Sequence, residues 1–147
     1  MKKVFIVVGK SNSRKSSVIR CLSGCRDSKD NWNIATQNSK EDKFFVNVTS
    51  PQEKNGVGIS PKKFVELLKK AKSENVLTAL QSKSSSGQPN GEEYLKALIN
   101  ADFDIQPLIL FDDTVNTQGL NAHMIVGSAT NPCNQTAAQI KNIWPII

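Results

Sequence analysis

One uninterrupted apolar segment near the start of the chain places the strongest constraint on the fold. Residues 4–8 read Val-Phe-Ile-Val-Val, are hydrophobic at every position, and are followed by Gly9. Successive side chains of a strand point to opposite faces of a sheet, so a strand of this composition must be covered on both faces. We therefore expect a central strand of a parallel sheet, with helices packed on either side.

The rest of the chain alternates between strand-like and helix-like patterns. Further strands are expected at 44–48, 76–80, 105–111 and 123–126, and helices at about 15–23, 61–71, 92–100 and 131–144. The polar segment 26–42 is expected to be a mobile loop, in which only Trp32, Ile34 and Ala35 hint at a short edge strand. This order predicts a three-layer α/β fold with a mostly parallel sheet of five to six strands, formed by residues 1–147 as a single domain.

Composition and charge narrow the class of partner. The 147 residues, 38% of them hydrophobic, suffice for one domain with its own core. An excess of basic residues gives a formal net charge of +6, which favours partners that carry phosphate or another negative charge. No apolar run approaches the roughly 18 residues of a transmembrane span. The three cysteines form no disulfide or zinc pattern and no export signal is recognisable, so we expect a cytoplasmic protein without a transmembrane segment.

The segment that joins the first strand to the first helix has the spacing of a phosphate-binding loop. Such a loop needs a glycine after the strand, a second glycine where the backbone approaches the phosphate, a lysine for the phosphates, and a Ser or Thr for Mg²⁺. Gly9, Lys15 and Ser16 stand at three of these positions, whereas Arg14 replaces the second glycine. The candidate phosphate-binding residues are Gly9, Asn12, Ser13, Arg14, Lys15, Ser16 and Ser17.

Residues 8–24 resemble the first motif of P-loop GTPases of the small, Ras-like or translation-factor-like class. The match includes Asn12, three residues before Lys15, and the closing sequence Leu22-Ser23-Gly24. This resemblance implies a P-loop NTPase-like fold. It also implies a bound GTP, GDP or other nucleotide as the ligand, with a Mg²⁺ ion held by Ser16.

The later motifs of that family are only partly matched. Thr49-Ser50-Pro51-Gln52 stands where the family has Asp-Thr-Pro-Gly, so the Mg²⁺-linked Asp and the γ-phosphate-sensing Gly are both replaced. The segment 113–116 lies where Asn-Lys-x-Asp would read guanine, but it ends in Asn116. Residues 127–130 resemble the Ser-Ala motif beside the base. The resemblance therefore implies weak base discrimination and slow or absent hydrolysis, with base-side contacts from Asp113, Asn116, Ser128 and Ala129.

Two other functions stay open on the sequence. Arg14 could fill the phosphate site, in which case the scaffold would serve as a pseudo-NTPase that binds a protein partner. The basic loop and the lysine-rich helix face at 62–72 could instead contact nucleic acid. This second alternative is the less favoured one, because the chain has one Tyr and no recognisable RNA-binding motif.

Other reactive side chains are expected to have structural roles. His123, the only histidine, begins an apolar strand, and Cys21 and Cys25 lie one helical turn apart, so all three are predicted to be packed in the core. The pair Asp112-Asp113 follows an apolar strand and is predicted to form a turn rather than a Mg²⁺ site.

Overall fold

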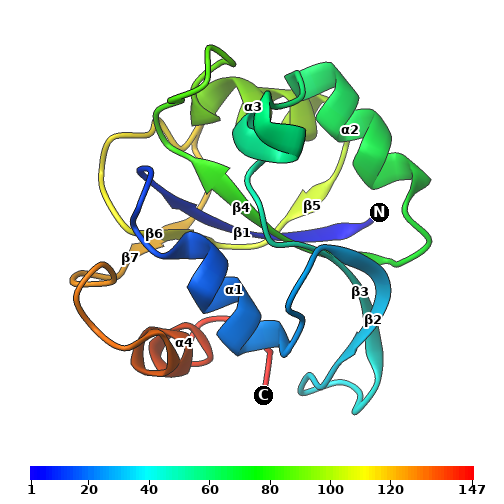
Figure 1. Ribbon diagram of the computed structural model, residues 1–147. Helices are drawn as coiled ribbons and strands as arrows, with labels where there is room; N and C mark the ends of the chain where they lie inside the picture. The colour runs from blue at the N-terminus through cyan, green and yellow to red at the C-terminus, as the bar shows by residue number, and fades with distance from the viewer.

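A computed structural model describes residues 1–147 and shows a seven-stranded sheet with helices on both faces (Figure 1). The strands are β1 (Lys3–Gly9), β2 (Lys29–Ile34), β3 (Asp42–Asn47), β4 (Asn75–Gln81), β5 (Asp104–Ile105), β6 (Leu108–Leu110) and β7 (Ala122–Met124). The helices are α1 (Lys15–Ser23), α2 (Pro61–Lys70), α3 (Gly91–Asn100), α4 (Cys133–Ile140) and the short 3₁₀ helix η1 (Pro51–Gly56). None of the helices is both long enough and apolar enough to cross a membrane.

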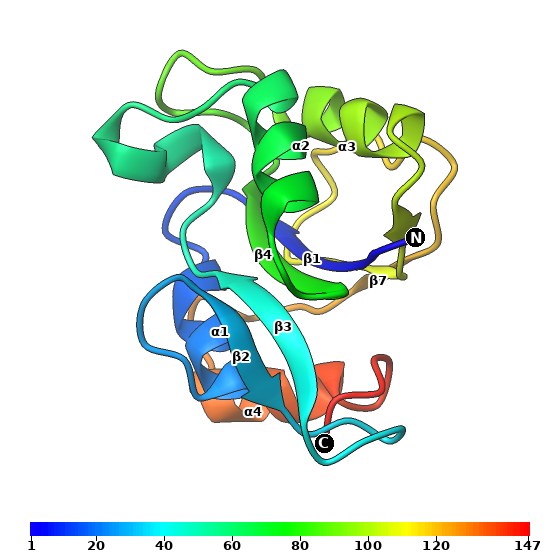
Figure 2. The same cartoon turned by 90° about the vertical axis from the view of Figure 1, so that its right-hand side faces the viewer.

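The central position expected for the first strand is confirmed. β1 lies between β4 and β6, and every residue from Val4 to Val8 is at most 2% exposed. Phe5 and Val7 belong to one hydrophobic cluster, shared with α1 and α4, whereas Val4, Ile6 and Val8 belong to another, shared with α2 and α3. Figure 2 shows the two pairs of helices on opposite sides of the sheet. The α/β architecture follows from this two-sided burial.

The sheet is mixed, which corrects the expectation of a mostly parallel sheet of five to six strands. The strand order is β2-β3-β4-β1-β6-β7, with the short β5 also paired to β1. β2 runs antiparallel to β3, whereas the other pairings are parallel. The expectation of a loop over 26–42 was therefore wrong at 29–34. β2 is an edge strand whose side chains are largely in contact with solvent, so its polar sequence carries little hydrophobic signal.

The predicted starts of the first two helices agree with the structure. α1 begins at Lys15 as expected, and the Gly24 N–H donates to the Arg20 carbonyl to end it. α2 begins at Pro61, and the Ser60 side chain accepts a hydrogen bond from the Lys63 N–H.

Two expected elements are shorter than predicted, one because of a proline within it and one because of a tertiary contact. The strand expected at 105–111 is divided into β5 and β6, since Pro107 has no N–H to donate to the sheet. α4 ends at Ile140 rather than near Trp144. The Trp144 ring packs edge-on against Phe5 at 5.3 Å between ring centroids, and its Nε1 donates to the Pro107 carbonyl at 2.7 Å.

The expectation of core packing was wrong for two of the three reactive side chains. His123 is exposed because β7 is an edge strand, and Cys21 is exposed on α1. Only Cys25 is buried. An apolar-looking sequence does not distinguish an edge strand from a covered one.

Candidate functional site

The loop between β1 and α1, residues 10–14, turns sharply at the carboxyl end of the central strand. The Ser13 N–H and Oγ both donate to the Lys10 carbonyl, at 3.3 and 2.7 Å. A Cβ added to Gly9 would lie 2.6 Å from Ser13 Oγ and 3.0 Å from Phe111 Cβ. A side chain larger than that of glycine would therefore displace the loop, which is the physical reason for glycine at this position.

Arg14 occupies a backbone conformation that glycine adopts without strain. Its φ of 68° and ψ of 26° are left-handed, and it forms the N-cap of α1 without a side-chain cap. The guanidinium Nη1 donates to the Asn131 carbonyl at 3.1 Å, on the exposed segment before α4. The end of the side chain is thus held at the segment before α4.

Lys15 is a buried cation without a paired carboxylate. Its side chain is 7% exposed, and Nζ donates to the Lys10 carbonyl and, at 3.4 Å, to Ser13 Oγ. The only ion pair within 4.0 Å in the structure joins Lys96 to Glu93. Burial lowers the pKa of Lys15, and the more distant charges of Glu53 and Asp112 offset this only in part. A negatively charged group beside Nζ would relieve this desolvation.

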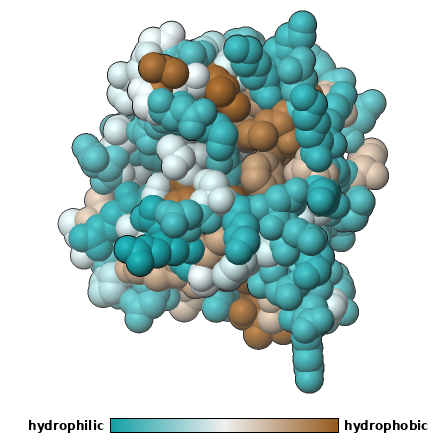
Figure 3. Space-filling model, turned by 45° about the vertical axis from the view of Figure 1, so that its right-hand side comes forward, coloured by the Kyte–Doolittle hydropathy of each residue, from teal (hydrophilic) through white to brown (hydrophobic).

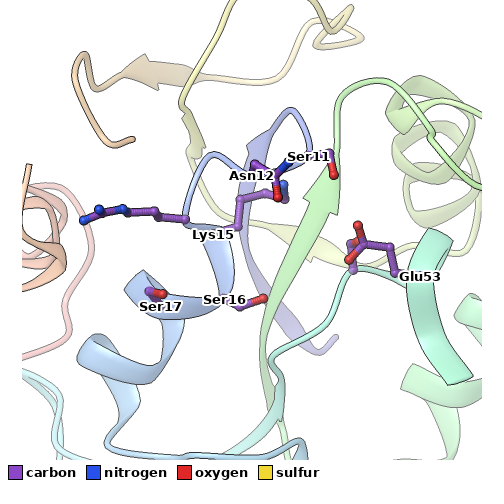
Figure 4. A pocket seen from close by; sticks show the side chains of 8 residues that line it. Ser11, Asn12, Lys15, Ser16, Ser17 and Glu53 are labelled. Atoms are coloured by element: carbon purple, nitrogen blue, oxygen red, sulfur yellow. The ribbon is translucent and has the colours of Figure 1, made fainter. Parts of the chain in front are cut away.

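A cavity of about 350 Å³, lined by no hydrophobic residue, opens beside Lys15 (Figure 4). We refer to it as the loop cavity, and it is lined by Ser11, Asn12, Arg14, Lys15, Ser16, Ser17, Ser50 and Glu53. In Figure 4, Glu53 faces Ser16 and Lys15 from a separate segment of chain. One oxygen of Glu53 accepts a hydrogen bond from the Gln81 side-chain amide. The cavity therefore has a cationic wall on the loop and α1, and a second wall at the start of η1.

The residues of the loop cavity do not fit the Mg²⁺ site that the resemblance implies. The Ser16 hydroxyl donates to the Val48 carbonyl at 2.9 Å, so it is held against the backbone. Glu53 is the only carboxylate in the lining, and it already accepts from Gln81. No cluster of three His, Cys, Asp or Glu side chains suitable for a metal ion occurs in the structure. One tethered hydroxyl and one engaged carboxylate are few oxygen ligands for Mg²⁺.

A second cavity of about 320 Å³ adjoins the loop cavity and shares Ser11 and Asn12 with it. We refer to it as the flanking cavity, and it is lined by Lys10, Ser11, Asn12, Ser13, Phe111, Asp112, Gly127, Ser128, Ala129 and Thr130. Ser128 and Ala129, expected beside a base, lie in this lining. Asp113 and Asn116 are exposed and line neither cavity, so the structure separates them from the other candidates.

Asp113 was predicted to contact a base, but its neighbour Asp112 is the carboxylate that holds the β1–α1 loop. One oxygen accepts from the Lys10 N–H at 2.7 Å and from Ser82 Oγ at 3.4 Å, and the other accepts from the Thr114 N–H and hydroxyl. Partial burial raises the pKa of Asp112, but these donors outweigh it and the pKa lies below its ordinary value. The prediction that the pair Asp112-Asp113 belongs to a turn agrees with the Thr114 contacts.

The candidate residues are thus brought together in two groups. Asn12, Arg14, Lys15, Ser16 and Ser17 line the loop cavity, while Gly9 and Ser13 shape the loop itself. Sequence reasoning missed the contributions of Ser50, Glu53 and Asp112. A signal was present, because the carboxyl ends of parallel strands meet at one edge of a sheet, and 48–53 and 111–113 directly follow such strands.

No protein-family model, no curated protein and no solved structure matches the chain.

Proposed function

We propose that the chain binds a phosphate-bearing ligand in the loop cavity, with a nucleotide such as GTP or GDP as the leading candidate. The buried and unpaired Lys15 carries this proposal, because a charge removed from water requires an opposite charge or a full set of hydrogen bonds. The N-terminus of α1 adds to it, since no side chain caps it and no acidic residue lies in its first turn. Helix N-termini in this state attract anions.

Weak or absent hydrolysis belongs to the same proposal. Thr49 stands where the resembled family has an aspartate, and Gln52 stands where it has a glycine. The Gln52 side chain is fully buried, donating to the Gln81 carbonyl at 2.8 Å and accepting from the Gln81 N–H at 3.1 Å. Its amide is thereby committed to the end of β4 rather than to a water molecule at the ligand.

The alternative of a pseudo-NTPase with a plugged site requires Arg14 to lie in the phosphate position. Its hydrogen bond to the Asn131 carbonyl favours an open loop cavity instead. If the protein binds no phosphate-bearing ligand, that result would favour a role as a protein-interaction module.

Titration calorimetry with pyrophosphate, GTP and ATP tests the proposal, with and without Mg²⁺. We expect Lys15→Ala to weaken pyrophosphate binding by at least about a hundredfold, roughly 2.7 kcal/mol, because it removes the buried cation. Lys10→Ala is the matched control, since Lys10 contacts the loop through its backbone. It should change the affinity by less than about threefold. Absence of binding by the wild-type protein would refute the proposal.

A further inference from the structure

Ser50 is a buried serine whose hydroxyl has no partner within the protein. It follows β3 and precedes η1, and it is 1% exposed. Its Oγ is one of three buried side-chain oxygens that form no hydrogen bond, and the residue lines the loop cavity. A buried hydroxyl without a partner is unfavourable, so a group that satisfies it is expected.

A serine just before a helix commonly caps it, but Ser50 does not cap η1. Ser50-Pro51 and Ser60-Pro61 both precede a helix, and both serines have extended backbones, with φ and ψ of −64° and 151° and of −68° and 162°. Ser60 caps α2 by accepting from the Lys63 N–H at 3.2 Å. Ser50 makes no side-chain cap to η1. The same dipeptide therefore has a satisfied hydroxyl in one place and a free one in the other.

The position of Ser50 identifies the kind of group that it lacks. Ser50 and Glu53 are the two residues of the loop cavity that do not come from the loop or α1. The Glu53 carboxylate can only accept hydrogen bonds, and it repels an anion. Ser50 is thus the one side-chain donor on this wall, across from the cationic wall that contains Lys15. An anionic oxygen between the two walls would receive a hydrogen bond from each side.

We propose that Ser50 is a ligand-binding residue whose hydroxyl donates to a phosphoryl oxygen of the ligand held by Lys15. The inference rests on the proposed phosphate-binding function. It adds Ser50, on the second wall of the loop cavity, to the residues that contact the phosphate. The phosphate then lies inside the loop cavity, between the N-terminus of α1 and the start of η1, and occupancy links these two segments.

The test measures pyrophosphate affinity by titration calorimetry and thermal stability for the wild-type protein, Ser50→Ala and Ser60→Ala. We expect Ser50→Ala to bind pyrophosphate about tenfold or more weakly, because hydrogen bonds to charged groups contribute at least this much. Its melting temperature should stay within about 2 °C of wild type, since no internal hydrogen bond is lost. Ser60→Ala should melt about 2–4 °C lower, through loss of a helix cap, with unchanged affinity.

Three results would overturn the assignment in distinguishable ways. Equal affinity of Ser50→Ala and wild type would refute the role of Ser50 while leaving the phosphate site in place. A weaker affinity accompanied by a loss of stability as large as that of Ser60→Ala would show a structural role. A wild-type protein that binds no pyrophosphate would refute the proposed function itself, and the role of Ser50 with it.

Discussion

The loop cavity and the flanking cavity share Ser11 and Asn12 but differ in what they offer a ligand. The loop cavity presents a buried cation without a paired carboxylate, a helix N-terminus without a side-chain cap, and a hydroxyl without a hydrogen-bond partner. The flanking cavity presents Asp112, whose two oxygens are already occupied by the protein's own donors. Backbone geometry and one lysine suffice to attract phosphate, whereas reading a base requires particular side chains at particular places.

Figure 3 shows a face that is mainly hydrophilic, with hydrophobic side chains gathered in its upper half, at the level at which α2 and α3 lie in Figures 1 and 2. The expected exposed contacts to a base, Asp113 and Asn116, lie outside both cavities. The contrast between the two cavities and the residues around them leads to five predictions.

The largest expected effect is the loss of affinity when the phosphates of the nucleotide are removed. Guanosine, which has the base and ribose but no phosphate, should bind at least about a thousandfold more weakly than GTP, a difference of roughly 4 kcal/mol. The reason is that the buried cation without a paired carboxylate, Lys15, lines the loop cavity and not the flanking cavity. Competition of each compound against a fluorescent nucleotide measures the ratio, and similar affinities would show that the base provides most of the binding.

The next effect concerns the carboxylate that holds the loop. Asp112→Asn should lower the free energy of unfolding by about 1–2 kcal/mol, because one oxygen that accepts from the Lys10 N–H or from Thr114 becomes a donor. Asp113→Asn is the matched control, since Asp113 is exposed, and it should change stability by less than about 0.5 kcal/mol. Urea unfolding of both variants at neutral pH measures the difference.

The same contact predicts a pH dependence with a definite sign. The pKa of Asp112 lies below its ordinary value of 3.8, so its contribution to stability is present above that value. It is lost as the pH falls through the lowered pKa of the folded state. The stability difference between wild type and Asp112→Asn should accordingly shrink in acid, and a difference that grows below pH 4 would contradict the assignment.

A smaller effect concerns base discrimination. GTP should be preferred over ATP by no more than about tenfold, roughly 1.4 kcal/mol, because no free carboxylate lies in the flanking cavity. Calorimetric titration of both nucleotides at equal Mg²⁺ gives the ratio. A preference of a thousandfold would mean that another residue reads guanine after a rearrangement.

The smallest effect concerns the strained residue of the loop. Arg14→Gly should raise the free energy of unfolding by about 0.5–1 kcal/mol, because glycine adopts the left-handed backbone at φ 68° without strain. Arg14→Ala keeps that strain and serves as the control, so it should bring no gain. Phosphate affinity should change by less than about tenfold in Arg14→Gly. A gain of a hundredfold would show that the arginine side chain blocks the cavity.

Patterns within one segment were enough to predict several features of this protein. The apolar residues 4–8 determine a strand that needs cover on both faces, and the helix starts at Lys15 and Pro61 follow from the local sequence. These features depend on neighbours a few residues away, because caps, stops and hydrophobic periodicity are local properties.

Only the tertiary structure decided which polar groups meet and which stay unpaired. The polar sequence of β2 becomes a strand because β3 offers it an edge, and His123 is exposed because nothing covers β7. Asp112 rather than its neighbour reaches the Lys10 N–H, and Ser50, unlike Ser60, has a hydroxyl without a hydrogen-bond partner and lines the loop cavity. These outcomes depend on the packing of segments 30 to 100 residues apart, where a shift of one residue changes the direction in which a side chain points.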